Sequence, residues 1–153
     1  MPGQIRYTSQ LPAEHLSALQ ELMFFNEKQP QYRAGIVASI EQFGEPVVRS
    51  EGGFLRIHTT RLGEVQTLFA LEEDEEASRP IGVAVYARSA EDAITVLHIG
   101  VDKDFASDGL HADQMVAVNL FQRLIEVGRK IKGIRKAIVL YGPTEYTEIP
   151  IRR

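Results

Sequence analysis

The segment 93–141 constrains the fold of this chain more than any other, because its hydrophobic pattern changes from strand-like to helical and back. Residues 93–101 have the composition of a strand. From 110 to 131 the apolar residues recur at every third or fourth position, which predicts a helix. The run 136–141 is almost continuously apolar and predicts a strand buried on both faces. Two strands joined through such a helix lie parallel in one sheet, with a right-handed crossover.

The region before this unit predicts a short strand and two helices. Residues 4–8 can form an opening strand. Pro12 opens a first helix that Pro30 ends, and a second helix is predicted over 32–43, where the following Gly44 terminates it.

Alternating and apolar runs then predict four antiparallel strands. Residues 54–60 and 65–71 are expected to pair as a hairpin, and 81–87 and 93–101 are expected to follow as neighbours in a meander. The acidic run 72–76 is typical of a solvated turn between strands, because five neighbouring carboxylates repel one another.

These elements predict an α+β fold in one domain that spans residues 1–153. Its mixed sheet would contain the antiparallel meander and the parallel strand, with the first helices before it. After 136–141 the chain has room for one short edge strand, near 146–149. A chain of 153 residues buries enough surface to fold without disulfides or metal.

Composition excludes several classes of function. The chain has no Cys, which excludes disulfides, thiolate metal sites and cysteine nucleophiles. Its 17 basic and 21 acidic residues give a formal net charge of −4, which argues against nucleic-acid binding. No apolar stretch reaches the roughly 18–20 residues of a membrane span, and the first residues lack the layout of a secretory signal. We therefore expect a cytoplasmic protein.

The order of elements and several segments resemble the GNAT superfamily of N-acetyltransferases. Residues 79–84 (Arg-Pro-Ile-Gly-Val-Ala) look like a strand of the family sheet, and 97–105 resembles its central strand and exit. Residues 120–130 resemble the long helix, and 134–140 the strand that follows it. The resemblance covers roughly 65–141 and is more architectural than motif-based.

This resemblance implies a GNAT-like binding site for acetyl-CoA or another acyl-CoA between the central strand and the post-helix strand. In the family, a glycine loop at the start of the long helix holds the pyrophosphate through backbone N–H groups. The equivalent stretch here is 106–111, in which only Gly109 matches a family glycine and His111 replaces the last small residue. The residues implied in cofactor binding are Ile99, Gly100, Val101, Gly109, Leu110 and His111.

Two side chains are candidates for acid–base catalysis within this resemblance. His98, in the central strand, would accept the proton of the acceptor amine. Tyr141, at the end of the last strong strand, would protonate the leaving thiolate. The alternative interpretations are a core histidine and a packed aromatic ring.

The predicted function is an acyl-CoA-dependent N-acyltransferase that passes an acyl group, expected to be acetyl, to a small-molecule amine or a peptide. The alternative is a catalytically inactive GNAT-like domain for ligand binding or dimerisation. We expect a homodimer in which segment 144–151 takes part, because the last strong strand would otherwise leave an apolar edge. No metal site is predicted, since no histidine pair has zinc-protease spacing and the acidic residues after 101 do not match a calcium loop.

Overall fold

A computed structural model describes residues 4–24, 33–106, 109, 111–139 and 147–152 of the chain. It contains a six-stranded mixed sheet in the order β1-β5-β6-β7-β8-β9 and a three-stranded sheet in the order β2-β3-β4. The α+β class with a mixed sheet is therefore confirmed. The strands of the large sheet are β1 (Gln4–Thr8), β5 (Gln66–Glu73), β6 (Ser78–Ala90), β7 (Ala93–Val101), β8 (Lys136–Val139) and β9 (Thr147–Pro150).

The other elements lie before β5 or between β7 and β8. The small sheet consists of β2 (Pro46–Glu51), β3 (Phe54–Thr59) and β4 (Gly63–Glu64). The α-helices are α1 (Leu16–Phe24), α2 (Arg33–Phe43) and α3 (Val116–Lys130). Single 3₁₀ turns are η1 (Ala13–His15), η3 (Lys103–Phe105) and η4 (Ala112–Gln114). No helix in the described ranges is long and apolar enough to cross a membrane.

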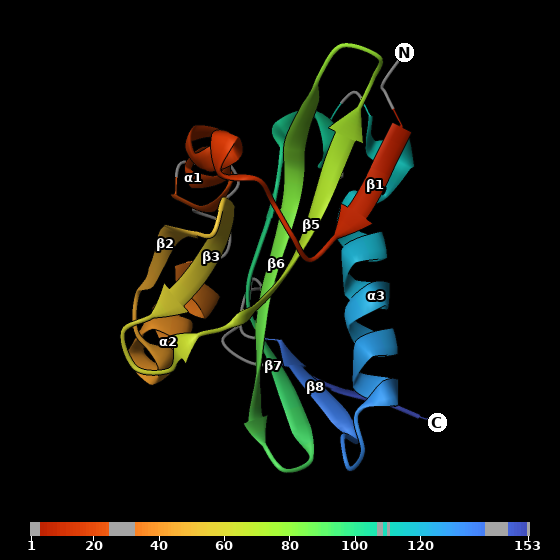
Figure 1. Cartoon of the computed structure of the whole chain (residues 1–153). Helices are drawn as coiled ribbons and strands as arrows, with labels where there is room; N and C mark the ends of the chain where they lie inside the picture. Colours follow the sequence, from red (N-terminus) through yellow and green to blue (C-terminus); the bar gives the residue numbers. More distant parts are fainter. Residues whose placement is uncertain (1–3, 25–32, 107–108, 110, 140–146, 153) are drawn as a thin grey trace.

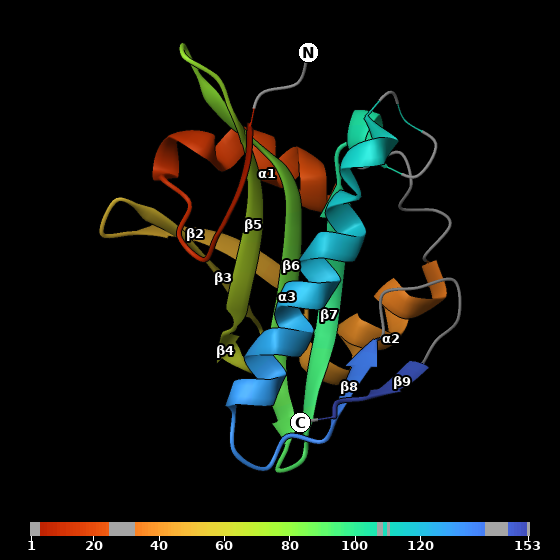
Figure 2. The same ribbon diagram turned by 90° about the vertical axis from the view of Figure 1, so that its right-hand side faces the viewer.

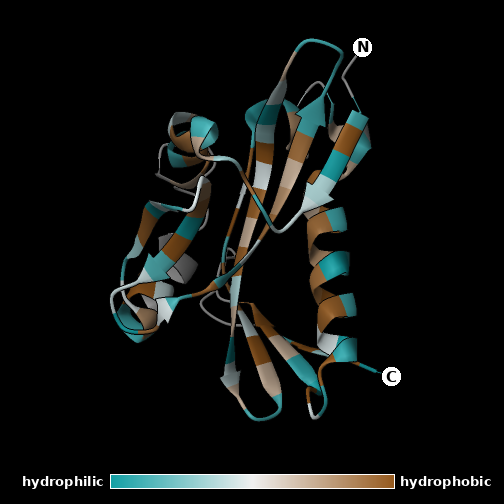
Figure 3. Ribbon diagram, in the orientation of Figure 1, coloured by the Kyte–Doolittle hydropathy of each residue, from teal (hydrophilic) through white to brown (hydrophobic). Residues whose placement is uncertain are grey.

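The large sheet is covered differently on its two faces. Helix α3 lies along one face, and α1, α2 and the small sheet lie on the other (Figures 1 and 2). The apolar stripe of α3 faces the sheet, where Val116, Leu120 and Leu124 are fully buried. Hydrophobic residues accordingly follow the central strands, whereas α3 and β1 alternate in character (Figure 3). The central strands are thus buried on both sides, which explains their nearly continuous apolar sequence.

The parallel pair at the centre of the prediction is present. Strands β7 and β8 pair in parallel, and the other neighbours in the large sheet are antiparallel. The last turn of α3 carries Arg129 and Lys130, whose charges favour a helix C-terminus. The edge strand expected near 146–149 is β9, which pairs with β8. This covers the edge of β8 that had motivated the expected homodimer.

The predicted four-stranded meander is wrong in its first member. Strand β3 does not pair with β5 but with β2 and β4 in the separate small sheet. Strand β2, which the sequence analysis missed, supplies this pairing, and β5 pairs instead with β1 and β6. The glycines at 52 and 53 make the turn of the β2–β3 hairpin, both with positive φ, so the hairpin closes before β3 rather than after it.

The acidic run forms the predicted turn, between β5 and β6. The carboxylate of Asp74 accepts hydrogen bonds from the backbone N–H groups of Glu76 (2.9 Å) and Ala77 (2.8 Å). These two bonds lower the pKa of Asp74. The turn is therefore built by Asp74 and the residues directly after it, where β5 has ended.

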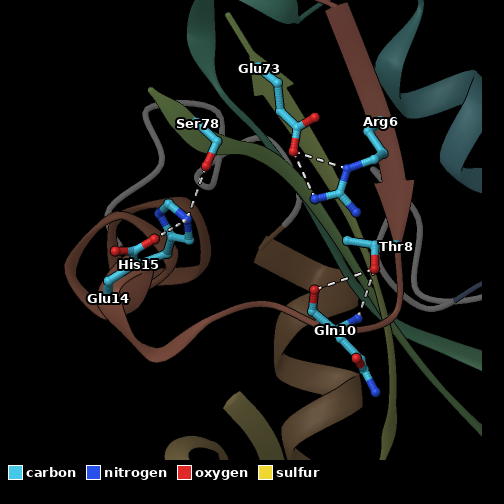
Figure 4. A network of polar contacts seen from close by, with 7 residues as sticks. All are labelled: Arg6, Thr8, Gln10, Glu14, His15, Glu73 and Ser78. Atoms are coloured by element: carbon cyan, nitrogen blue, oxygen red, sulfur yellow. Dashed lines mark hydrogen bonds and ion pairs between the residues drawn. The ribbon is translucent and has the colours of Figure 1, made fainter. Parts of the chain in front are cut away.

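The N-terminal strand and η1 are tied to β5 and β6 by polar contacts (Figure 4). Arg6 donates from Nε (3.0 Å) and Nη2 (2.7 Å) to Oε1 of Glu73. Nε2 of His15 lies 3.4 Å from the hydroxyl of Ser78 and 3.6 Å from Oε1 of Glu14. These contacts fix the chain that leads into α1.

The helix predicted over 110–131 begins later than expected. Residues 102–115 contain η3 and η4, and α3 starts at Val116. Met115, just before the helix, has a left-handed conformation (φ 50°, ψ 47°). Such a residue interrupts the regular α-helical path, so the loop does not lead directly into the helix.

Candidate functional site

A β-bulge in β7 positions the candidate site. His98 pairs with Val85 of β6, but the next pair joins Val96 with Tyr86, so Leu97 is an extra residue on β7. Side chains of a regular strand alternate between faces, and a bulge breaks this alternation. Leu97 and His98 therefore both face the α1/α2 side, where both line one cavity.

The cavity lies between the large sheet and its cover of α1, α2 and the small sheet, and has a volume of about 310 Å³. This is near the lower end of the range for small-molecule sites. Most of its lining is apolar, with a few polar side chains. The lining residues are Met23, Ser39, Ile40, Gly44, Glu45, Pro46, Thr59, Val85, Leu97 and His98.

His98 is the most perturbed titratable group among those described. Its side chain is buried, with 7% of the residue exposed, and burial lowers its pKa to about 4. The imidazole is therefore neutral at pH 7 and offers one hydrogen-bond donor and one acceptor. Ser39 and Thr59 are the other buried polar residues of the lining. The hydroxyl oxygen of Thr59 accepts a hydrogen bond from the N–H of Leu62 (3.0 Å).

The three residues after His98 are explained in part by packing. A Cβ at Gly100 would lie 2.6 Å from the carbonyl oxygen of Leu22, so only glycine lets the end of α1 approach β7 this closely. Ile99 and Val101 pack on the opposite face, against the α3 side. The structure thus places all three predicted cofactor residues of this strand beside His98, with Gly100 under α1.

Among the described residues, β8 pairs with the first part of β7. The parallel register covers Ala93–Val96 of β7, and β7 continues to Val101 alongside β6. The described part of β8 ends at Val139. Backbone N–H groups along a strand alternate between its two neighbours, so some of those after Val96 point to the β8 side. Tyr141, the predicted acid, lies outside the described residues.

The predicted pyrophosphate loop packs on η3. A Cβ at Gly109 would lie 2.2 Å from the carbonyl oxygen of Lys103 and 2.5 Å from that of Asp104, so this glycine serves a close backbone approach within the loop. The ring of His111 lies 5.1 Å from that of Phe105, between centroids. The structure brings Gly109 and His111 together, and Leu110 falls outside the described residues.

Two backbone N–H groups among the described residues of this loop are engaged internally. That of Gly109 donates to Ala106 (2.9 Å) and that of His111 to Asp104 (2.6 Å). In the first turn of α3, the N–H groups of Val116, Ala117 and Val118 have no acceptor within the helix because of their position, whereas that of Asn119 donates to the carbonyl of Met115 (2.9 Å).

Sequence reasoning missed most of the cavity lining. Ser39 lies on α2, and Pro46 begins β2, a strand that was not predicted. No spacing signal in the sequence connects α2 with residues on β7. The alternation of Phe54, Arg56 and His58 was the one available signal for a sheet in this region.

No family model, no curated protein and no solved structure matches this chain.

Proposed function

We propose that the protein is an acyl-CoA-dependent N-acyltransferase, with acyl-CoA between β7 and β8 and an amine acceptor in the cavity. The observation that supports this most is the β-bulge at Leu97, which turns both Leu97 and His98 toward the cavity. This stretch of β7 directly follows Val96, which pairs with Val139, the last described residue of β8. A thioester entering beside β7 and an acceptor in the cavity would meet at this one stretch of strand.

In this proposal the residues of β7 assist a direct attack. Backbone N–H groups near Gly100 polarise the thioester carbonyl. The neutral acceptor nitrogen forms a bond to the carbonyl carbon, and the bond from that carbon to sulfur breaks. The proton of the nitrogen passes to His98, directly or through water, and Tyr141 protonates the leaving sulfur.

The test is turnover of acetyl-CoA with a panel of amines, followed through the released CoA thiol. A thiol reagent is well suited because the protein has no Cys to react with it. His98→Gln should lower turnover by about 10²–10⁴-fold while acetyl-CoA binding stays unchanged, and Tyr141→Phe should have a smaller effect.

The matched control is His15→Gln, which replaces a partly buried histidine of η1 that does not line the cavity. Circular dichroism verifies that each variant is folded. Full turnover in a folded His98→Gln variant would contradict the assignment of His98. No acyl transfer to any amine would contradict the proposed activity.

A second candidate function is ligand binding without catalysis, and two observations favour it. A histidine whose pKa is about 4 is a weak base at pH 7. The N–H groups of Gly109 and His111 are engaged within their loop. This candidate predicts that small molecules raise the melting temperature through the cavity, whereas acetyl-CoA neither binds nor turns over.

The homodimer stays a prediction, and its expected segment 144–151 contains β9. Since β9 pairs with β8, the edge strand on this side of the large sheet is β9. This strand has four residues, ends at Pro150 and carries Glu148, which are features that limit edge pairing. Sedimentation at tens of micromolar protein would show a dimer if β9 nevertheless pairs with a second copy.

A further inference from the structure

We propose that Glu51, His58 and Glu64 form a zinc-binding site on the small sheet, separate from the cavity. The three residues come from three strands: Glu51 ends β2, His58 lies in β3, and Glu64 ends β4. Each offers one atom of a type that binds transition metals, and these three atoms all lie within 4.8 Å of one another. The topology of the small sheet therefore gathers one imidazole and two carboxylates.

The sheet register accounts for the approach of His58 and Glu64, whereas Glu51 is the cross-strand partner of Phe54 and approaches His58 through its side chain. His58 is the direct cross-strand partner of Glu64, so their side chains share one face. On β3, residues Leu55 and Ile57 point into the core, and His58 lies on the opposite, outer face. The side chains of Glu51 and Glu64 are half exposed (51% and 52%), so an ion in solvent can reach both carboxylates.

The environment of the imidazole nitrogen points to an additional ligand. Nε2 of His58 is buried and makes no hydrogen bond to any described residue. It lies 3.3 Å from Oε1 of Glu51, close enough for an ion pair but not aligned as a hydrogen bond. Buried polar nitrogens are normally satisfied, so this atom calls for a partner.

The donor set and the spacing fit zinc. Zinc binds imidazole nitrogen and carboxylate oxygen at about 2.0–2.2 Å, so tetrahedral ligand atoms lie about 3.3–3.5 Å apart. The separation of 3.3 Å between His58 and Glu51 already meets this requirement. Three protein ligands leave the fourth position to water. Mg²⁺ and Ca²⁺ prefer all-oxygen sites and are disfavoured here.

The positive charge of Arg56 opposes the binding of a cation at this site. Replacing Arg56 therefore tests whether its charge changes zinc affinity in the expected direction. Nε of Arg56 lies 3.6 Å from Oε1 of Glu64, and Arg56 pairs in register with Arg49 of β2. Zinc would compete with Arg56 for the carboxylate of Glu64 and would be repelled by its charge. Removing the Arg56 charge should therefore strengthen zinc binding, whereas removing a ligand should weaken it.

The experiment is isothermal titration of ZnCl₂ into the untagged full chain at pH 7.5 in a buffer that does not bind zinc. We expect one zinc per chain, and no measurable heat with MgCl₂ or CaCl₂. Glu51→Gln and His58→Gln should each weaken binding by about tenfold or more. Arg56→Gln should strengthen it by about two- to fivefold, the range of an exposed charge pair. Glu14→Gln, in the separate His15–Glu14 pair, is the matched control and should change nothing.

Two outcomes would overturn the proposal: no zinc binding by the wild-type chain, or zinc binding that neither Glu51→Gln nor His58→Gln weakens. The exposed Glu51 keeps the test valid if the partly buried His58 variant does not fold. The result is independent of acyl transfer, because the small sheet supplies all three ligands.

Discussion

The two faces of the large sheet are covered by different kinds of structure, and the difference determines where the candidate site lies. On one face a single amphipathic helix, α3, buries Val116, Leu120 and Leu124 completely. On the other face two short helices and a second sheet share the cover, and the cavity with His98 remains between them. One regular element fits a sheet closely, whereas a cover assembled from several pieces leaves space for a ligand.

The largest difference between the two faces is expected when a buried side chain is truncated on each of them and the free energy of unfolding is compared. Leu120→Ala should lower the free energy of unfolding by about 2–5 kcal/mol, because the packed α3 face cannot refill the space. Leu97→Ala removes the same atoms beside the existing cavity, where the side chain has fewer contacts to lose. Urea denaturation should place Leu97→Ala at the low end of this range. Equal losses would mean that the two faces are packed alike.

The pH dependence of stability should report the burial of His98. Its pKa is about 4 in the folded protein and near 6.5 when unfolded, so the unfolded chain binds more protons between these values. This contribution is fully present above pH 6.5 and is lost as the pH falls toward 4, by about 3 kcal/mol in total. Urea melts at pH 7 and pH 4.5 should show the loss, and His98→Gln should reduce it. An unchanged loss in His98→Gln would assign the effect to other groups.

Gly100 and Gly82, both in central strands, differ in what an added methyl group would contact: backbone atoms at Gly100 and side chains at Gly82. At Gly100 a new methyl group would meet the carbonyl oxygen of Leu22 at 2.6 Å, so α1 would have to move. At Gly82 it would meet Cγ1 of Val116 at 2.9 Å and Cδ1 of Leu120 at 3.1 Å, which are ends of side chains. Gly100→Ala should cost about 2–3 kcal/mol and Gly82→Ala about 1 kcal/mol. Thermal melts that reverse this order would show that α1 yields more easily than α3.

The smallest effect is expected within the cavity itself. Ser39→Ala removes a buried hydroxyl from α2, and alanine also favours the helix. The free energy of unfolding should change by less than about 1 kcal/mol. The same denaturation series measures it. A loss comparable to that of Leu120→Ala would show that the hydroxyl stabilises this cover.

The sequence predicted the elements whose signals are local. Strand β7 has the predicted bounds, and the helical spacing through Leu120 and Leu124 identified α3. The start of α3 was misplaced because apolar spacing says nothing about Met115 adopting a left-handed conformation. The pairing of β3 was misassigned because β2 is short and partly polar, so its pattern did not register as a strand.

The candidate site was predictable only where it lies on β7. His98 was singled out from its place in a central strand, but the bulge at Leu97 depends on the register with β6. The remaining lining comes from segments far away in sequence, such as Ser39 and Thr59, which meet only in the folded chain. Gly109 was interpreted as a phosphate-loop residue, and its close approach to Lys103 and Asp104 could not be anticipated from spacing.

The bulge has a consequence for how this sheet tolerates changes in chain length. Val96 faces α3, as do Ile99 and Val101. The residues of β7 that face α3 therefore change from even to odd positions in the sequence across the bulge at Leu97. Deleting Leu97 alone would restore strict alternation without turning either half of β7 inside out. The alternation of β7 thus does not depend on Leu97, and shortening the strand by this one residue would keep Val96 on the α3 face and His98 on the cavity face.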